Sequence, residues 1–139
     1  MKNSKKMLSA AFALFVMLAP AFAQTAAIRV RVPFDFNVGK QILAAGDYRV
    51  NLDGAALQFI NVDGRGACYA ISNYTGGGID QDVRPRLVFH VYGERHFLTE
   101  AWMGEGNMGH ELSTSKVEQE YARNVPPQQT FILAASNTR

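Results

Sequence analysis

The stretch "YRVNLDGAALQFINVDGRGACYAIS", residues 48–72, decides the fold, because it holds two Asp-Gly pairs between alternating apolar runs. Asp-Gly in this setting favours a tight β-hairpin, since both central residues of the turn need positive φ. The pairs Asp53-Gly54 and Asp63-Gly64 therefore predict a meander of three antiparallel strands.

Two-residue turns at both places put one set of side chains on one face of that meander. Val50 pairs with Leu57 in the first hairpin, and Phe59 pairs with Cys68 in the second. The shared face consists of Tyr48, Val50, Leu57, Phe59, Cys68 and Ala70. Because two independent turns select the same face, we expect it to be buried, with the only cysteine of the chain inside.

The segments on either side of the meander also read as strands. Residues 28–38, "IRVRVPFDFNV", alternate apolar and polar side chains throughout. This pattern predicts a half-buried strand, and Pro33 makes it an edge strand or two strands joined at a kink. Residues 130–135, "TFILAA", predict a last strand near the C-terminus.

One helix is expected in the second half of the chain. Ser115 and Glu118 fit a capping box, and "KVEQEYAR" consists of good helix formers with a thin apolar face made mainly of Val117 and Tyr121. The sequence therefore predicts one all-β domain over residues 24–139. The expected architecture is an antiparallel β-sandwich or flattened barrel with one short helix in the C-terminal half.

Residues 1–23 are typical of a secretory signal peptide, with a basic start, a short apolar stretch and small residues at the end. Cleavage near Ala23-Gln24 would release a periplasmic or secreted chain with no segment apolar enough to span a membrane. The leader holds three of the 14 basic residues, so the mature chain, with its 12 carboxylates, is slightly acidic. Nucleic-acid binding is therefore not expected, and the predicted partner is an unknown protein or glycan at the cell envelope.

Residues 87–102, "LVFHVYGERHFLTEAW", carry two histidines, and the register of this hairpin decides whether they meet. A two-residue loop at Gly93-Glu94 suits a turn that begins with glycine, and it sends the histidines to opposite faces. A three-residue loop brings His90, His96 and Glu100 to one face. It also gathers a better core on the other face, namely Leu87, Phe89, Val91, Phe97 and Ala101. Turn chemistry favours the first register and apolar patterning the second, and both stay open.

The same hairpin supplies the candidate ligand-binding residues. Exposed aromatic rings beside polar groups suit sugars, so a small-ligand or carbohydrate site would use Tyr92 and Trp102 with His90 and Glu100. A metal site of His90, His96 and Glu100 is the weaker alternative, because these residues become only diagonal neighbours and no fourth ligand is evident. No metal and no cofactor are expected. His110, among several glycines, is expected to be a loop residue.

No catalytic motif is present, so we do not expect an enzyme. The chain lacks a Gly-x-Ser-x-Gly elbow, a His-Glu-x-x-His pair and a dinucleotide-binding loop. Glu100 and Glu111 would form an acid/base pair only through a tertiary arrangement that the sequence does not show. The prediction is an exported, non-catalytic β-domain that acts by binding or structural contact.

Three segments resemble a group of small exported proteins of unknown function from acidobacteria. They are "VPFDFNVGKQILAAGDYRV" at 32–50, "RPRLVFHVYGERHFLTEAW" at 84–102 and "GHELSTSKVEQE" at 109–120. This resemblance implies no activity and no functional residues. "LAAGDYRV", residues 43–50, is also similar to a strand of prealbumin-like and carboxypeptidase-regulatory-like domains, with Ala44 in place of a proline, which implies a sandwich fold.

Overall fold

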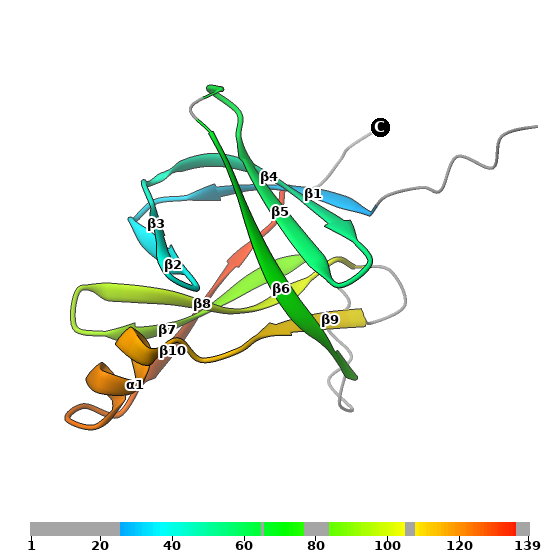
Figure 1. Ribbon diagram of the computed structural model, residues 1–139. Helices are drawn as coiled ribbons and strands as arrows, with labels where there is room; N and C mark the ends of the chain where they lie inside the picture. Colours follow the sequence, from blue (N-terminus) through cyan, green and yellow to red (C-terminus); the bar gives the residue numbers. More distant parts are fainter. Residues whose placement is uncertain (1–25, 65, 77–83, 105–107, 136–139) are drawn as a thin grey trace, which may run out of the picture.

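The structure, a computed structural model, describes residues 26–64, 66–76, 84–104 and 108–135, and most of these form β-strands (Figure 1). The strands are β1 (Ala27–Val32), β2 (Phe36–Val38), β3 (Gln41–Leu43), β4 (Gly46–Asp53), β5 (Ala56–Asn61), β6 (Ala67–Gly76), β7 (Arg86–Tyr92), β8 (Arg95–Trp102), β9 (Met108–Leu112) and β10 (Gln128–Leu133). The helix α1 (Lys116–Ala122) lies between β9 and β10. The predicted signal peptide, residues 1–23, lies outside the described residues. No helix in the described ranges is long and apolar enough to cross a membrane.

The strands form one mixed sheet that folds back on itself without closing into a barrel. Its hydrogen-bonded order is β1-β4-β5-β6-β9-β8-β2-β3, while β7 and β10 continue from β8. Figure 1 shows β1, β4 and β5 in one layer and β7 to β10 in the other, with the long β6 crossing between them. The buried cluster takes Val50 and Leu57 from the first layer and Leu87 and Phe89 from the second. The predicted all-β, sandwich-like fold with one short helix is therefore confirmed.

The expectation of a purely antiparallel sheet is wrong at one place. β2 pairs with β8 in parallel, through Asn37 and Phe97. The physical reason is the break in the first strand segment: the chain leaves β1 at Val32, passes Pro33 and re-enters the sheet as β2 beside β8. The predicted kink at Pro33 is thus confirmed.

The meander forms as predicted, but its first loop is displaced by one residue. Phe59 pairs with Cys68 in the second hairpin, as the Asp-Gly turn requires. In the first hairpin Val50 pairs with Phe59 instead of Leu57, because Gly54-Ala55 forms the loop and Gly54 has a φ of 59°. This displacement moves every partner by two positions, so no side chain changes face. All six predicted inward side chains lie in the core or against it.

The hairpin of β7 and β8 has the register of a two-residue loop next to its turn. His90 pairs with Phe97 and Val91 pairs with His96, and Gly93 has a φ of 63°. Neighbouring positions on a strand point to opposite faces, so the two histidines lie on opposite sides of the sheet.

Farther from the turn the same hairpin has the register of a three-residue loop. The pairing shifts by one between Val88 and Phe89, and beyond this β-bulge Leu87 pairs with Ala101. Thr99 is the extra residue of β8, and its hydroxyl donates to the Val88 carbonyl at 3.1 Å. Leu87, Phe89 and Ala101 are all fully buried. The bulge therefore satisfies the turn chemistry and still places Leu87, Phe89 and Ala101 in the core, as the apolar pattern predicts. Phe97, expected on the same face, pairs with His90 and packs on Tyr92 and Tyr121, and Leu98 takes the core position instead.

The outer edge of β1 meets the end of the described chain. β1 pairs with β4 alone in the sheet order of the described strands. On its other edge the Ala135 N–H donates to the Arg29 carbonyl at 2.8 Å. The predicted last strand is confirmed as β10, which pairs with β7. After β10 the chain continues to Ala135 and its contact with the edge of β1.

We predict that the Cys68 thiol reacts slowly in the folded protein. It is 1% exposed beside its strand partner Phe59, and burial raises the pKa of the thiol, so little of the reactive thiolate forms. Labelling with an aromatic disulfide, followed by absorbance, should be at least about tenfold slower in buffer than in urea. Equal rates in the two solutions would contradict the burial of this face.

Candidate functional site

The structure divides the predicted site residues between the two faces of the hairpin. His96 stacks on Phe34, with ring centroids 3.7 Å apart and an interplanar angle of 13°. His90 lies on the other face, beneath α1. The three side chains considered for a metal therefore do not converge. No group of three or more His, Cys, Asp or Glu side chains that would hold a metal ion occurs in the described residues.

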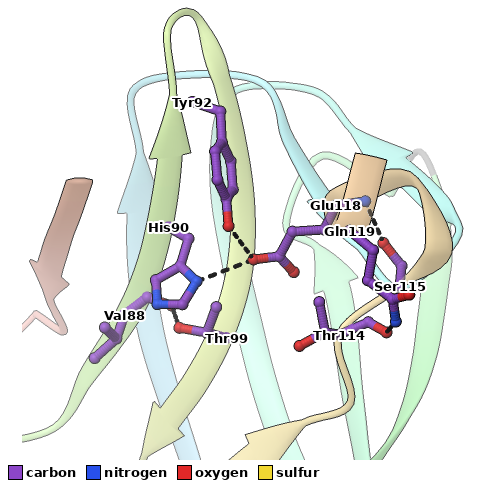
Figure 2. A network of polar contacts seen from close by, with 8 residues as sticks. All are labelled: Val88, His90, Tyr92, Thr99, Thr114, Ser115, Glu118 and Gln119. Carbon is purple, nitrogen blue, oxygen red and sulfur yellow. Dashed lines mark hydrogen bonds and ion pairs between the residues drawn. The ribbon is translucent and has the colours of Figure 1, made fainter. Parts of the chain in front are cut away.

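A buried carboxylate from α1 is the centre of a polar network on the outer face of β7 (Figure 2). Glu118 Oε1 accepts a hydrogen bond from the Tyr92 hydroxyl at 3.2 Å and lies 3.0 Å from His90 Nδ1. Since an ionised carboxylate only accepts, His90 carries its proton on Nδ1 and donates it. Glu118 is 4% exposed. Burial, reinforced by the Glu118 charge, raises the pKa of the Tyr92 hydroxyl.

The helix cap brings Glu118 to this place. The Ser115 hydroxyl accepts from the Glu118 N–H at 3.2 Å, which is one half of the predicted capping box. In the other half the Glu118 side chain would return to the Ser115 backbone, but it turns to the sheet instead. Val117, expected on the buried side, is 44% exposed. Tyr121 packs on Tyr92 with ring centroids 6.3 Å apart, so the helix docks through an acid and a tyrosine three residues apart.

The His90–Glu118 pair has the geometry by which a carboxylate orients a catalytic histidine, but the neighbouring residues indicate a structural role. A carboxylate on Nδ1–H leaves Nε2 as a proton acceptor, as in a general base. Thr99, which lies beside His90 in Figure 2, donates its hydroxyl to the Val88 carbonyl. In the described chain no hydroxyl or thiol donates to His90. What the network visibly does is hold α1 on the sheet.

The two aromatic residues expected to bind a ligand are in different situations. Tyr92 is 5% exposed and gives its hydroxyl to Glu118, so it offers no surface to a ligand, contrary to expectation. The reason is the helix, which covers that end of the hairpin. Trp102 is half-buried, and its indole N–H donates to Glu100 at 2.8 Å. The Arg86 guanidinium lies 4.9 Å from the centroid of the Trp102 ring.

Glycine makes room for Trp102 on the neighbouring strand. A Cβ added at Gly109 would lie 2.8 Å from two atoms of the Trp102 ring. Next to this pair, Glu100 and Glu111 are direct partners across β8 and β9. The register thus supplies the proximity of two carboxylates that the sequence did not show. A sugar site at Trp102 and Glu100 stays a prediction.

A second buried polar pair escaped sequence reasoning. His110, expected in a loop, lies on β9 and is 5% exposed, with its Nδ1 at 3.2 Å from the Ser72 hydroxyl oxygen. Ser72 donates its one hydroxyl proton to the Ala55 carbonyl at 3.0 Å, so it accepts from His110 Nδ1–H. This polarity is the reverse of an activated nucleophile, whose proton passes to the histidine. His110 Nε2 is buried and has no hydrogen-bond partner among the described residues, and burial lowers the pKa of this histidine.

We predict that Glu118→Ala destabilises the protein by about 1–3 kcal/mol, because the substitution leaves the buried Tyr92 hydroxyl and His90 Nδ1–H without their acceptor. Glu120→Ala, on the exposed side of the same helix, is the matched control and should change stability by less than about 0.5 kcal/mol. Urea unfolding followed by circular dichroism measures both. Equal effects of the two substitutions would mean that the network does not anchor α1.

We predict that His110 makes the fold sensitive to mild acid. Its pKa in the folded chain lies below the ordinary value of 6.5, so below about pH 6.5 the unfolded chain binds a proton that the folded chain does not. The stabilisation that depends on a neutral His110 is therefore fully present above this pH. As pH decreases further, the free energy of unfolding falls by at most about 1.4 kcal/mol per pH unit. His110→Asn keeps a donor near Ser72 without a titrating ring and should flatten the dependence between pH 7.5 and 5.5. The free energy of unfolding is measured with urea at several pH values for both proteins. If it changed with pH equally in the wild-type protein and in His110→Asn, the assignment to His110 would be refuted.

The chain is not similar to any protein with which it was compared. No protein-family model, no curated protein and no solved structure matches it. The motif resemblance described above therefore remains a prediction, and function has to be argued from the residues of this chain and their arrangement.

Proposed function

We propose that the protein is an exported, non-catalytic β-domain that acts by contact with a protein partner in the periplasm or at the cell surface. The signal-peptide pattern of residues 1–23 supports the location. The charge balance of the mature chain is close to neutral, which fits a partner recognised by shape and apolar surface better than one recognised by net charge.

One observation carries the contact role: two large side chains stand on the outer face of β6 with most of their surface in solvent. Tyr69 is 66% exposed and Ile71 is 74% exposed. They are two positions apart on one strand and therefore point to the same side. Exposed apolar side chains that lie next to each other form a contiguous patch, which is typical of an interaction surface.

Neighbouring polar side chains hold this surface in one conformation. Gln58 donates to the Tyr69 hydroxyl at 2.6 Å, and Asn51 donates to Gln58 at 3.3 Å. The three residues form a row across β4, β5 and β6. A tyrosine that is already ordered loses less conformational entropy on binding, which favours a contact surface at this place.

The roles of the polar groups elsewhere also favour contact over catalysis. Glu118 joins α1 to the sheet, and Ser72 joins His110 to the Ala55 carbonyl. These groups have structural partners in the fold. A glycan partner near Trp102 and Glu100 remains the alternative, and a metal-dependent role for His90 and His96 has no geometric support because they lie on opposite faces.

We predict that a photo-cross-linking amino acid at position 71 captures a discrete partner in intact cells that make the protein. The same amino acid at position 120, on the exposed side of α1, is the control and should capture little. Denaturing gels resolve the adducts, and Tyr69→Ser should weaken the capture at position 71. Similar smears from both positions would refute a specific contact surface on β6. A product recovered with the leader still attached would refute the export.

A further inference from the structure

We infer that the outer groove over β1, β4 and β5 binds the anionic group, a phosphate or carboxylate, of a ligand that also has an apolar part. The inference goes beyond the proposed contact through β6 and rests on different residues. It depends on neither the export nor the partner of Tyr69 and Ile71.

The register of β1 and β4 places two arginines directly opposite each other. Arg29 pairs with Arg49, and both side chains are exposed. Like charges at directly opposed positions of a sheet repel each other. Neither arginine has an ion pair within the described ranges. An anion between the two guanidinium groups would remove the repulsion and accept several charge-assisted hydrogen bonds.

A third arginine on the same face, Arg31, has a carboxylate partner. Arg31, two positions along β1, binds Asp47 through two hydrogen bonds of 2.9 and 3.0 Å. Asp47 is the direct cross-strand partner of Arg31. This carboxylate is therefore hydrogen-bonded by Arg31, while the Arg29 charge acts on it only at longer range. Arg29 and Arg49 are thus the arginines of this face that hydrogen-bond no carboxylate in the described residues, which leaves their donors available to a ligand.

The two arginines line a groove that also has aliphatic side chains along one side. The groove is bounded by Ala27, Ile28, Arg29, Arg49, Ile60, Asn61, Val62 and Gly64. Ile60 continues the row of the arginines onto β5, and Val62 is 45% exposed. Asn61 pairs with the buried Tyr48, so its side chain points to the other face of the sheet and borders the groove only from the strand backbone. Two cations and two aliphatic side chains match an anionic head with a short apolar body.

The test is a titration of the purified protein with hexyl phosphate and with inorganic phosphate, followed by backbone amide shifts in NMR spectra. Hexyl phosphate should saturate the shifts at Ile60 and Val62 and bind more tightly than inorganic phosphate. Arg29→Gln and Arg49→Gln should each weaken binding about tenfold or more, the size expected for loss of a charge-assisted bidentate contact. Arg49→Lys keeps the charge but not the planar fork, and should bind with intermediate affinity.

Arg123→Gln, at the C-terminal end of α1, removes the same charge away from the groove and should change affinity less than about twofold. Equal losses in this control and in Arg49→Gln, or no saturable shifts in the wild-type protein, would overturn the inference. Vesicles of phosphatidylglycerol and of phosphatidylcholine identify the source of the anion. Sedimentation with the first alone, competed by hexyl phosphate, indicates a lipid headgroup, and hexyl phosphate binding without sedimentation indicates a soluble ligand.

Discussion

Side chains on a β-strand point to opposite faces at successive positions, and the rest of this structure depends on that alternation. A pairing error of one residue would turn the core outward, whereas an error of two leaves burial unchanged. The first hairpin therefore keeps its buried face although its loop is displaced. In the β7–β8 hairpin the turn and the apolar pattern differ by one, and the bulge at Thr99 absorbs the difference.

The parts of the fold that sequence reasoning predicted are those set by near neighbours along the chain. The Asp-Gly turns, the alternation of residues 28–38 and the cap at Ser115 each act within a few residues. The bulge is not predictable in this way, because the turn residues and the apolar pattern each indicate one register for the whole hairpin. Nothing in the local pattern shows that one hairpin can use both.

The candidate site was less predictable, because its geometry joins residues far apart in the chain. His90 and Glu118 lie 28 positions apart, and Ser72 and His110 lie 38 apart. Glu118 looked like half of a capping box, and only the docked helix shows that its carboxylate has better donors on the sheet. The sequence likewise does not show that Arg29 and Arg49 are neighbours. The overall charge of the chain is nearly balanced, and the two arginines repel each other only because β1 pairs with β4.

The bulge also determines at which position of β8 the chain tolerates the deletion of one residue. Thr99 is the one residue of β8 that stands outside the alternating ladder, so its deletion would make the ladder regular while each remaining residue kept its partner. Deletion of Ala101 would instead move Trp102 to the buried face, and deletion of Leu98 would put the polar Thr99 in the place of a buried leucine. Related chains one residue shorter in this hairpin could thus retain the same core, with the missing position at the bulge.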